Sequence, residues 1–80
     1  MKNKGINLKI FNIQEHLQDT IYCIDLINLK NDTTVDTIVY LDKDERNDFL
    51  VFYNKYNKDK NYTYIATDYY INEEGEMEIC

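Results

Sequence analysis

The chain has 80 residues, a formal net charge of −6 and 44% hydrophobic residues, among them eight Tyr and three Phe. This apolar and aromatic content excludes a disordered chain, and the short length limits it to one domain, residues 1–80, with a thin core. No apolar run reaches the roughly 20 residues that a membrane helix needs. The basic start, residues 1–4, is not followed by the apolar core of a signal peptide, so we expect a cytoplasmic protein without a membrane partner.

The first elements have weak signals. Apolar and polar residues alternate from Ile6 to Phe11, which predicts a short strand. Asn12, with Glu15 three residues later, can cap a short helix from Ile13 to about Gln18. A rival interpretation extends this helix through Ile27, because the spacing of the isoleucines in residues 12–30 also fits a helical period. We favour a strand there.

Residues 20–30 and 33–41 are rich in Ile, Val, Thr and Tyr and flank Asn31–Asp32, which predicts a β-hairpin. A two-residue turn would pair Lys30 with Thr33, and further pairs would follow. The expected pairs on the core face are Leu26–Thr37, Ile24–Val39 and Tyr22–Leu41. The opposite, mixed face would be covered by another element or by a partner, and it would hold Ile21, Cys23, Asp25, Ile27, Ile38 and Tyr40.

The clearest element is a helix from Lys43 to Tyr56. Asp42 can cap it, with Glu45 three residues later as in a capping box. One apolar face at helical spacing is predicted to pack on the sheet. Its members are Phe49, Phe52, Tyr53 and Tyr56, widened by Leu50, and Phe52 is expected to be buried.

After the helix, residues 62–71 predict a strand, and Gly75 turns the chain into a short strand from Glu76 to Ile79. These elements together predict an α+β domain. A small antiparallel sheet is packed by one main helix, and a second short helix is possible.

Catalytic and metal-binding residue types are scarce. The chain has no Ser, His16 is its single histidine, and Cys23 and Cys80 lack the paired spacing of a zinc site. We therefore expect no enzyme, no catalytic or metal site and no cofactor. Cys23 is expected in the core and Cys80 as a free thiol, with a disulfide between them as the alternative.

The segment from Asp68 to Cys80 holds five acids and no Lys or Arg. Anionic surfaces repel nucleic acid and attract basic protein surfaces. On a strand, Glu76 and Glu78 would share a face about 6.7 Å apart, a spacing similar to that of neighbouring phosphates. We predict a partner-binding site made of Asp68, Glu73, Glu74, Glu76 and Glu78. The alternative is a solvated hairpin whose acids aid solubility and deter edge pairing.

A second segment interleaves rings and cations, as single-strand binders do. Its residues are Tyr53, Lys55, Tyr56, Lys58, Lys60, Tyr62 and Tyr64. Because Tyr53 and Tyr56 belong to the predicted buried helix face and the net charge opposes a polyanion, we expect no direct nucleic-acid binding.

An acidic, compact α+β chain of this kind resembles the small anti-defence proteins of bacteriophages, such as anti-CRISPR inhibitors and other DNA mimics. The residues that carry the resemblance are Asp42, Asp44, Glu45, Asp48 and the five acids from Asp68 to Glu78. It implies an inhibitor that occupies the nucleic-acid path of a defence nuclease or CRISPR effector.

We therefore expect a non-enzymatic, phage-encoded inhibitor that binds a basic nucleic-acid-binding protein. The alternative is a small structural or regulatory subunit that docks, or forms a homodimer, through the mixed sheet face. A third hypothesis is a nucleic-acid binder that uses the Tyr/Lys segment.

Overall fold

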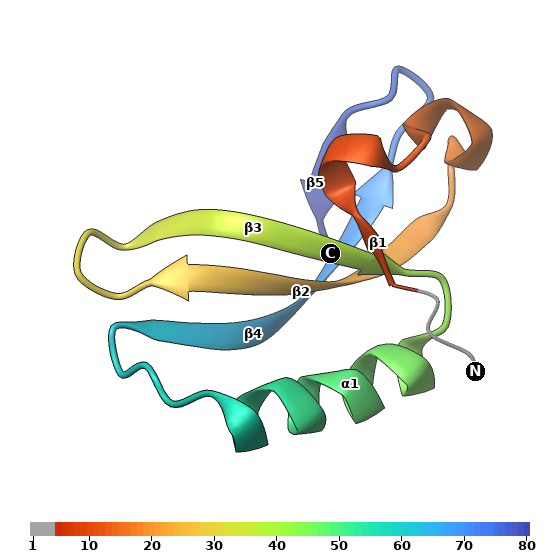
Figure 1. The fold of residues 1–80 in the computed structure, drawn as a ribbon. Coiled ribbons are helices and arrows are strands. Elements are labelled where there is room, and N and C mark those ends of the chain that lie inside the picture. The colour runs from red at the N-terminus through yellow and green to blue at the C-terminus, as the bar shows by residue number, and fades with distance from the viewer. Residues whose placement is uncertain (1–4) are drawn as a thin grey trace.

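The computed structural model describes residues 5–80, so the basic start at residues 1–4 lies outside the described part. Five antiparallel strands form one sheet in the order β1-β3-β2-β4-β5, and the helix α1 packs against it (Figure 1). The predicted α+β arrangement is confirmed. The elements are β1 (Ile6–Asn7), η1 (Leu8–Ile10), η2 (Ile13–His16), β2 (Thr20–Asn28), β3 (Thr33–Tyr40), α1 (Lys43–Tyr56), β4 (Tyr62–Ile71) and β5 (Met77–Ile79).

Helix α1 has the predicted bounds and the predicted cap. The Asp42 carboxylate accepts from the backbone N–H of Asp44 at 2.9 Å, which satisfies one of the N–H groups left open at a helix start. The predicted buried face is wrong in part, because Phe52 is 54% exposed and Tyr56 57% exposed. The face turned to the sheet instead runs through Arg46, Phe49 and Tyr53, and Tyr53 stacks on Tyr64 with ring centroids 5.0 Å apart.

The first segment is strand only at Ile6–Asn7 and then becomes the 3-10 helix η1. The side chain of Asn7 accepts from the backbone N–H of Lys9 at 2.9 Å, and this bond favours the turn over a continued strand. Asn12 caps a second short element as predicted, but this element is a 3-10 helix that ends at His16. The rival long helix is wrong, because Thr20–Asn28 is the central strand β2.

The β2–β3 hairpin forms with a different register from the predicted one. Its loop holds four residues, 29–32, with Asp32 in left-handed backbone, and the strands meet at Asn28 and Thr33. Val35 is an extra residue between the pairs Ile27–Thr34 and Leu26–Asp36. The register beyond this bulge is therefore shifted, and Ile24 lies opposite Ile38 instead of Val39.

The register shift changes which residues share a face. Ile21, Cys23 and Val39 belong to the core on the face away from α1, where the N-terminal segment covers them with Leu8, Phe11, Ile13 and Leu17. Tyr40 lies on the other face and stacks on Phe49 of α1, with centroids 5.5 Å apart. The predicted mixed face is therefore wrong as a docking or dimer surface, because Ile21 and Tyr40 are almost fully buried on opposite sides of the sheet.

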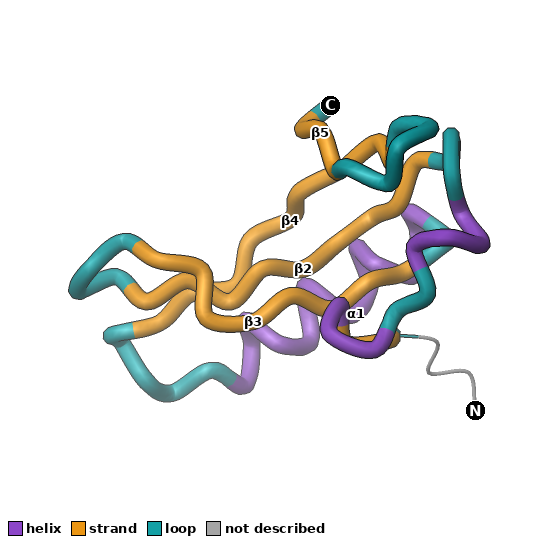
Figure 2. The backbone as a smooth tube through the Cα atoms, turned by 90° about the horizontal axis from the view of Figure 1, so that it is seen from above, coloured by secondary structure: helices purple, strands orange, loops and turns teal. Residues whose placement is uncertain are grey.

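The molecule has two clearly different ends (Figure 2). The hairpin loop at residues 29–32 and the α1–β4 loop lie together at one end, where the Leu29 N–H donates to the Asn61 carbonyl at 2.8 Å. The β4–β5 turn lies at the opposite end beside η2 (Figures 1 and 2). There the Gln18 N–H donates to the Ile71 carbonyl at 2.6 Å.

Candidate protein-binding surface at the acidic end

The acidic end is organised by Asn72, which follows β4. Its side-chain carbonyl accepts from the backbone N–H groups of Glu74 and Glu76, both at 2.9 Å. Its amide group donates to the carboxylates of Glu76 at 3.3 Å and Glu78 at 3.0 Å. One asparagine therefore shapes the turn and holds two carboxylates on the same side of the hairpin.

The turn itself requires left-handed backbone at Gly75, where φ is +86°. Glycine adopts this conformation without steric cost. A Cβ there would come within 3.2 Å of the Gln14 side-chain nitrogen, so the turn packs closely on η2. The four predicted glutamates (Glu73, Glu74, Glu76 and Glu78) are all exposed.

Two further acids join this end although they are distant in sequence. Glu15 lies in η2 and Asp19 just before β2, and both are exposed. The Asp19 carbonyl accepts from the Ile71 N–H at 2.9 Å, which brings this segment beside the acidic hairpin. Residues 12–19 and 72–80 contain no Lys or Arg, so six exposed acids gather where these segments supply only His16 as a possible cation. Glu15 and Asp19 were not predicted as site residues, because only the fold brings them to this end.

Asp68 differs from the other four predicted site residues. Its carboxylate accepts from Arg46 Nη1 at 2.9 Å, and its side chain is 30% exposed. It lies in the middle of β4, where it fastens the strand to α1. Its negative charge is largely matched by the guanidinium, so Asp68 adds less to the outward field than the glutamates do.

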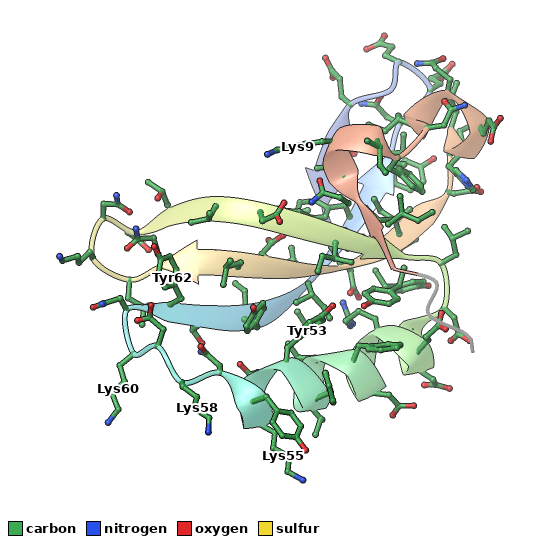
Figure 3. The ribbon with its side chains drawn as sticks, in the orientation of Figure 1. Lys9, Tyr53, Lys55, Lys58, Lys60 and Tyr62 are labelled. Carbon is green, nitrogen blue, oxygen red and sulfur yellow. The ribbon has the colours of Figure 1, made fainter. Side chains whose placement is uncertain are left out.

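The lysines of the Tyr/Lys segment gather at the opposite end of the molecule. Figure 3 shows Lys55, Lys58 and Lys60 along the end of α1 and the loop after it, and Lys30 lies in the adjoining hairpin loop. Tyr56 was predicted on the buried helix face, but it is mostly exposed, with Lys55 Nζ 5.6 Å from its ring centroid. Tyr53 lies on the side of α1 that faces the sheet (Figure 3). Its ring stacks on that of Tyr64, so one face of each ring is covered.

Side chains from the neighbouring strands β2, β3 and β4 form a small polar cluster. Asp25 is buried and accepts from the Thr37 hydroxyl at 2.7 Å and from the Tyr69 hydroxyl at 3.2 Å.

Burial, and then the nearby Asp25 carboxylate, raise the pKa of the Cys23 thiol to about 12. A thiol with this pKa stays protonated at neutral pH and is a poor nucleophile. Both cysteines are free, Cys23 buried and Cys80 exposed, as predicted without a disulfide.

An open groove of about 340 Å³ lies between η1 and the outer edge of β3. Two of its polar side chains are bonded to each other, because Asp36 accepts from the Asn7 side chain at 2.7 Å. Asp36 also accepts from the Thr37 N–H at 3.1 Å. The Val35 bulge interrupts the same edge. Bulges and inward-bonded charges deter the addition of a further strand, so this groove is a weaker candidate site.

Within residues 5–80, no group of three or more His, Cys, Asp or Glu side chains could hold a metal ion. In the same described range, the structure has no helix both long and apolar enough to span a membrane. No protein-family model, curated protein or solved structure matches this chain.

Proposed function

We propose that this chain is a non-enzymatic protein-binding inhibitor whose acidic end docks on the basic, nucleic-acid-binding surface of another protein. The observation that carries the proposal is the gathering of six exposed acids from two distant segments, neither of which contains a Lys or Arg. Lys55, Lys58 and Lys60 lie at the other end, whereas Lys9 lies in η1 (Figure 3) and Lys43 starts α1. The acidic end is therefore an anionic surface that the molecule can present to a cationic groove.

The hairpin would present its charges in a fixed arrangement. Asn72 holds the Glu76 and Glu78 carboxylates in place. Glu78 lies in β5 opposite Tyr70, whereas Glu76 just precedes this strand, which begins at Met77 and not at Glu76 as predicted. Preorganised side chains lose less conformational freedom on binding. Long-range attraction between opposite charges would speed association, and added salt would slow it by screening.

We further propose that the partner is a defence nuclease or a CRISPR effector and that the chain is phage-encoded, as the resemblance implies. The acids of this end would occupy the groove through which the partner holds its nucleic acid. Inhibition would then result from competition for that groove and would need no catalytic chemistry from this chain.

The proposal is tested by displacement. Purified nucleases and CRISPR effectors are loaded with fluorescently labelled DNA or guide–target duplex, and this protein is titrated in. We expect a true partner to release its nucleic acid in proportion to the amount of protein bound. A partner that binds the protein while holding its nucleic acid with unchanged affinity would contradict the competitive mechanism.

A mobility-shift assay separates this proposal from direct nucleic-acid binding through Tyr56 and its neighbouring lysines. We expect no shift of labelled single-stranded DNA or RNA at physiological salt, because the net charge of −6 opposes a polyanion. A tight complex that is lost in Tyr56→Ala would favour the nucleic-acid-binding hypothesis instead.

A further inference from the structure

The outer face of α1 exposes large apolar side chains that the fold does not use. Val51 is 68% exposed, Phe52 54% and Tyr56 57%. The Phe52 and Tyr56 rings contact each other, with centroids 4.9 Å apart, and make a continuous apolar surface. Grouped apolar side chains on a surface mark interaction sites more often than single ones do.

The same helix changes sign from its beginning to its end. After the exposed Lys43 at its first position, Asp44, Glu45 and Asp48 lie in its first turns, whereas Lys55 lies in its last turn and Lys58 follows the helix. Residues three and four apart are neighbours on a helix surface. Asp48, Val51, Phe52 and Lys55 therefore form one stripe, with an acid at one end, a base at the other and apolar residues between them.

Such a stripe is complementary to itself when two copies of the helix run antiparallel. With the two-fold axis between Val51 and Phe52, each Val51 meets Phe52 of the second copy. Asp48 then lies opposite Lys55. A parallel pair would place acid against acid and base against base. Two-fold contacts of this self-complementary kind are the commonest in homo-oligomers.

We propose that the outer face of α1 is a homodimer interface whose occupant is α1 of a second copy. A helix of 14 residues is about 21 Å long, so the contact lies at the small end of specific interfaces, below about 1,200 Å². The dimer is weak and depends on concentration. The inference does not rest on the proposed function, because it uses a different surface and leaves both acidic ends open.

Sedimentation equilibrium on the purified protein, carried to millimolar concentration at low salt, tests the dimer. We expect the mass to rise from one chain to two. Asp48→Lys or Lys55→Asp alone should weaken self-association by at least about tenfold, because each places two like-charge pairs in the interface. An equimolar mixture of these two variants should dimerise again, since every charge pair between unlike chains is then attractive.

Glu74→Lys makes the same charge change as Asp48→Lys but lies at the acidic end, and it should leave self-association unchanged. Phe52→Glu should abolish the dimer, with circular dichroism confirming that each variant keeps its fold. The proposal is wrong if the wild type stays monomeric at millimolar concentration. It is equally wrong if larger oligomers replace the dimer, if Phe52→Glu dimerises like the wild type, or if the variant mixture does not recover. None of these outcomes bears on the displacement assay, which tests the acidic end.

Discussion

Arg46 Nη1 donates to Asp68 Oδ1 at 2.9 Å and so joins α1 to β4. The same nitrogen donates to the Cys23 carbonyl of β2 at 3.1 Å, and Nε donates to the Asn47 side chain at 2.7 Å. Arg46 is the buried residue of α1. The Arg46 side chain is therefore held between α1 and the sheet by one ion pair and by hydrogen bonds to two neutral acceptors.

Arg46→Met should lower the free energy of unfolding by about 2–4 kcal/mol. The substitution leaves the Cys23 carbonyl and the partly exposed Asp68 carboxylate without their donor. The expected loss of stability is smaller than for a fully buried ion pair, because water reaches Asp68. Urea denaturation measures the change. Lys43→Met, an exposed cation on the same helix, is the control and should change stability by less than about 0.5 kcal/mol. Equal effects of the two substitutions would show that the pair does not anchor the helix.

Asp42→Ala should cost roughly 0.5–2 kcal/mol through loss of the helix cap. Asp42→Asn keeps an oxygen that can accept from the Asp44 N–H and should retain most of the stability. Chemical denaturation of the three proteins measures both effects. An alanine variant as stable as the wild type would contradict the observed cap bond.

Ile24→Ala should destabilise the domain by about 2–5 kcal/mol, because this side chain is 1% exposed and its loss leaves a cavity. Phe52→Ala should cost only about 1 kcal/mol, mainly from its ring contact with Tyr56. Thermal or urea unfolding ranks the two variants. A larger loss in Phe52→Ala would mean that this ring is buried, as the helical spacing had suggested.

The two thiols should differ in reactivity and in their effect at alkaline pH. A thiol reagent should modify Cys80 in the folded protein and Cys23 only after denaturation. Because the pKa of Cys23 rises from 9.0 to about 12 on folding, its contribution to stability is fully present below pH 9 and is lost as the pH rises from 9 towards 12. Cys23→Val should flatten this fall in urea unfolding measured across that range. An unchanged slope would contradict the raised pKa of Cys23.

The elements with local signals were predicted well. The Asp42 cap and the helical spacing after it are signals that lie within a few residues of each other, and they predicted α1 correctly. Strand β4 also has the predicted bounds. The hairpin register was wrong, because the loop holds four residues instead of two and a bulge follows at Val35. The bulge depends on pairing with β2 and leaves no local pattern. The buried Arg46 was also missed, since its partner Asp68 lies 22 residues away and arginine is seldom buried.

Only the part of the acidic site that is continuous in the sequence could be predicted. A run of glutamates around Gly75 is visible in the sequence, and Asn72 before it is a recognisable turn residue whose role could have been foreseen. Glu15 and Asp19 reach the site through the pairing of Ile71 with residues 18 and 19. That contact depends on the packing of the N-terminal segment, which sequence periodicity does not specify.

The most direct test of the acidic end is calorimetric titration of a nuclease or CRISPR effector that the protein displaces from its nucleic acid. The wild type is compared with a variant in which Glu73, Glu74, Glu76 and Glu78 are changed to Lys. A control carries acid-to-Lys changes at Asp32, Asp44 and Asp59, which are exposed acids elsewhere. Each protein is titrated at low and at high salt. We predict that the acidic-end variant loses binding, while the control binds and its affinity, like that of the wild type, falls with salt. Equal, salt-independent binding by all three proteins would contradict the proposed role of the acidic end.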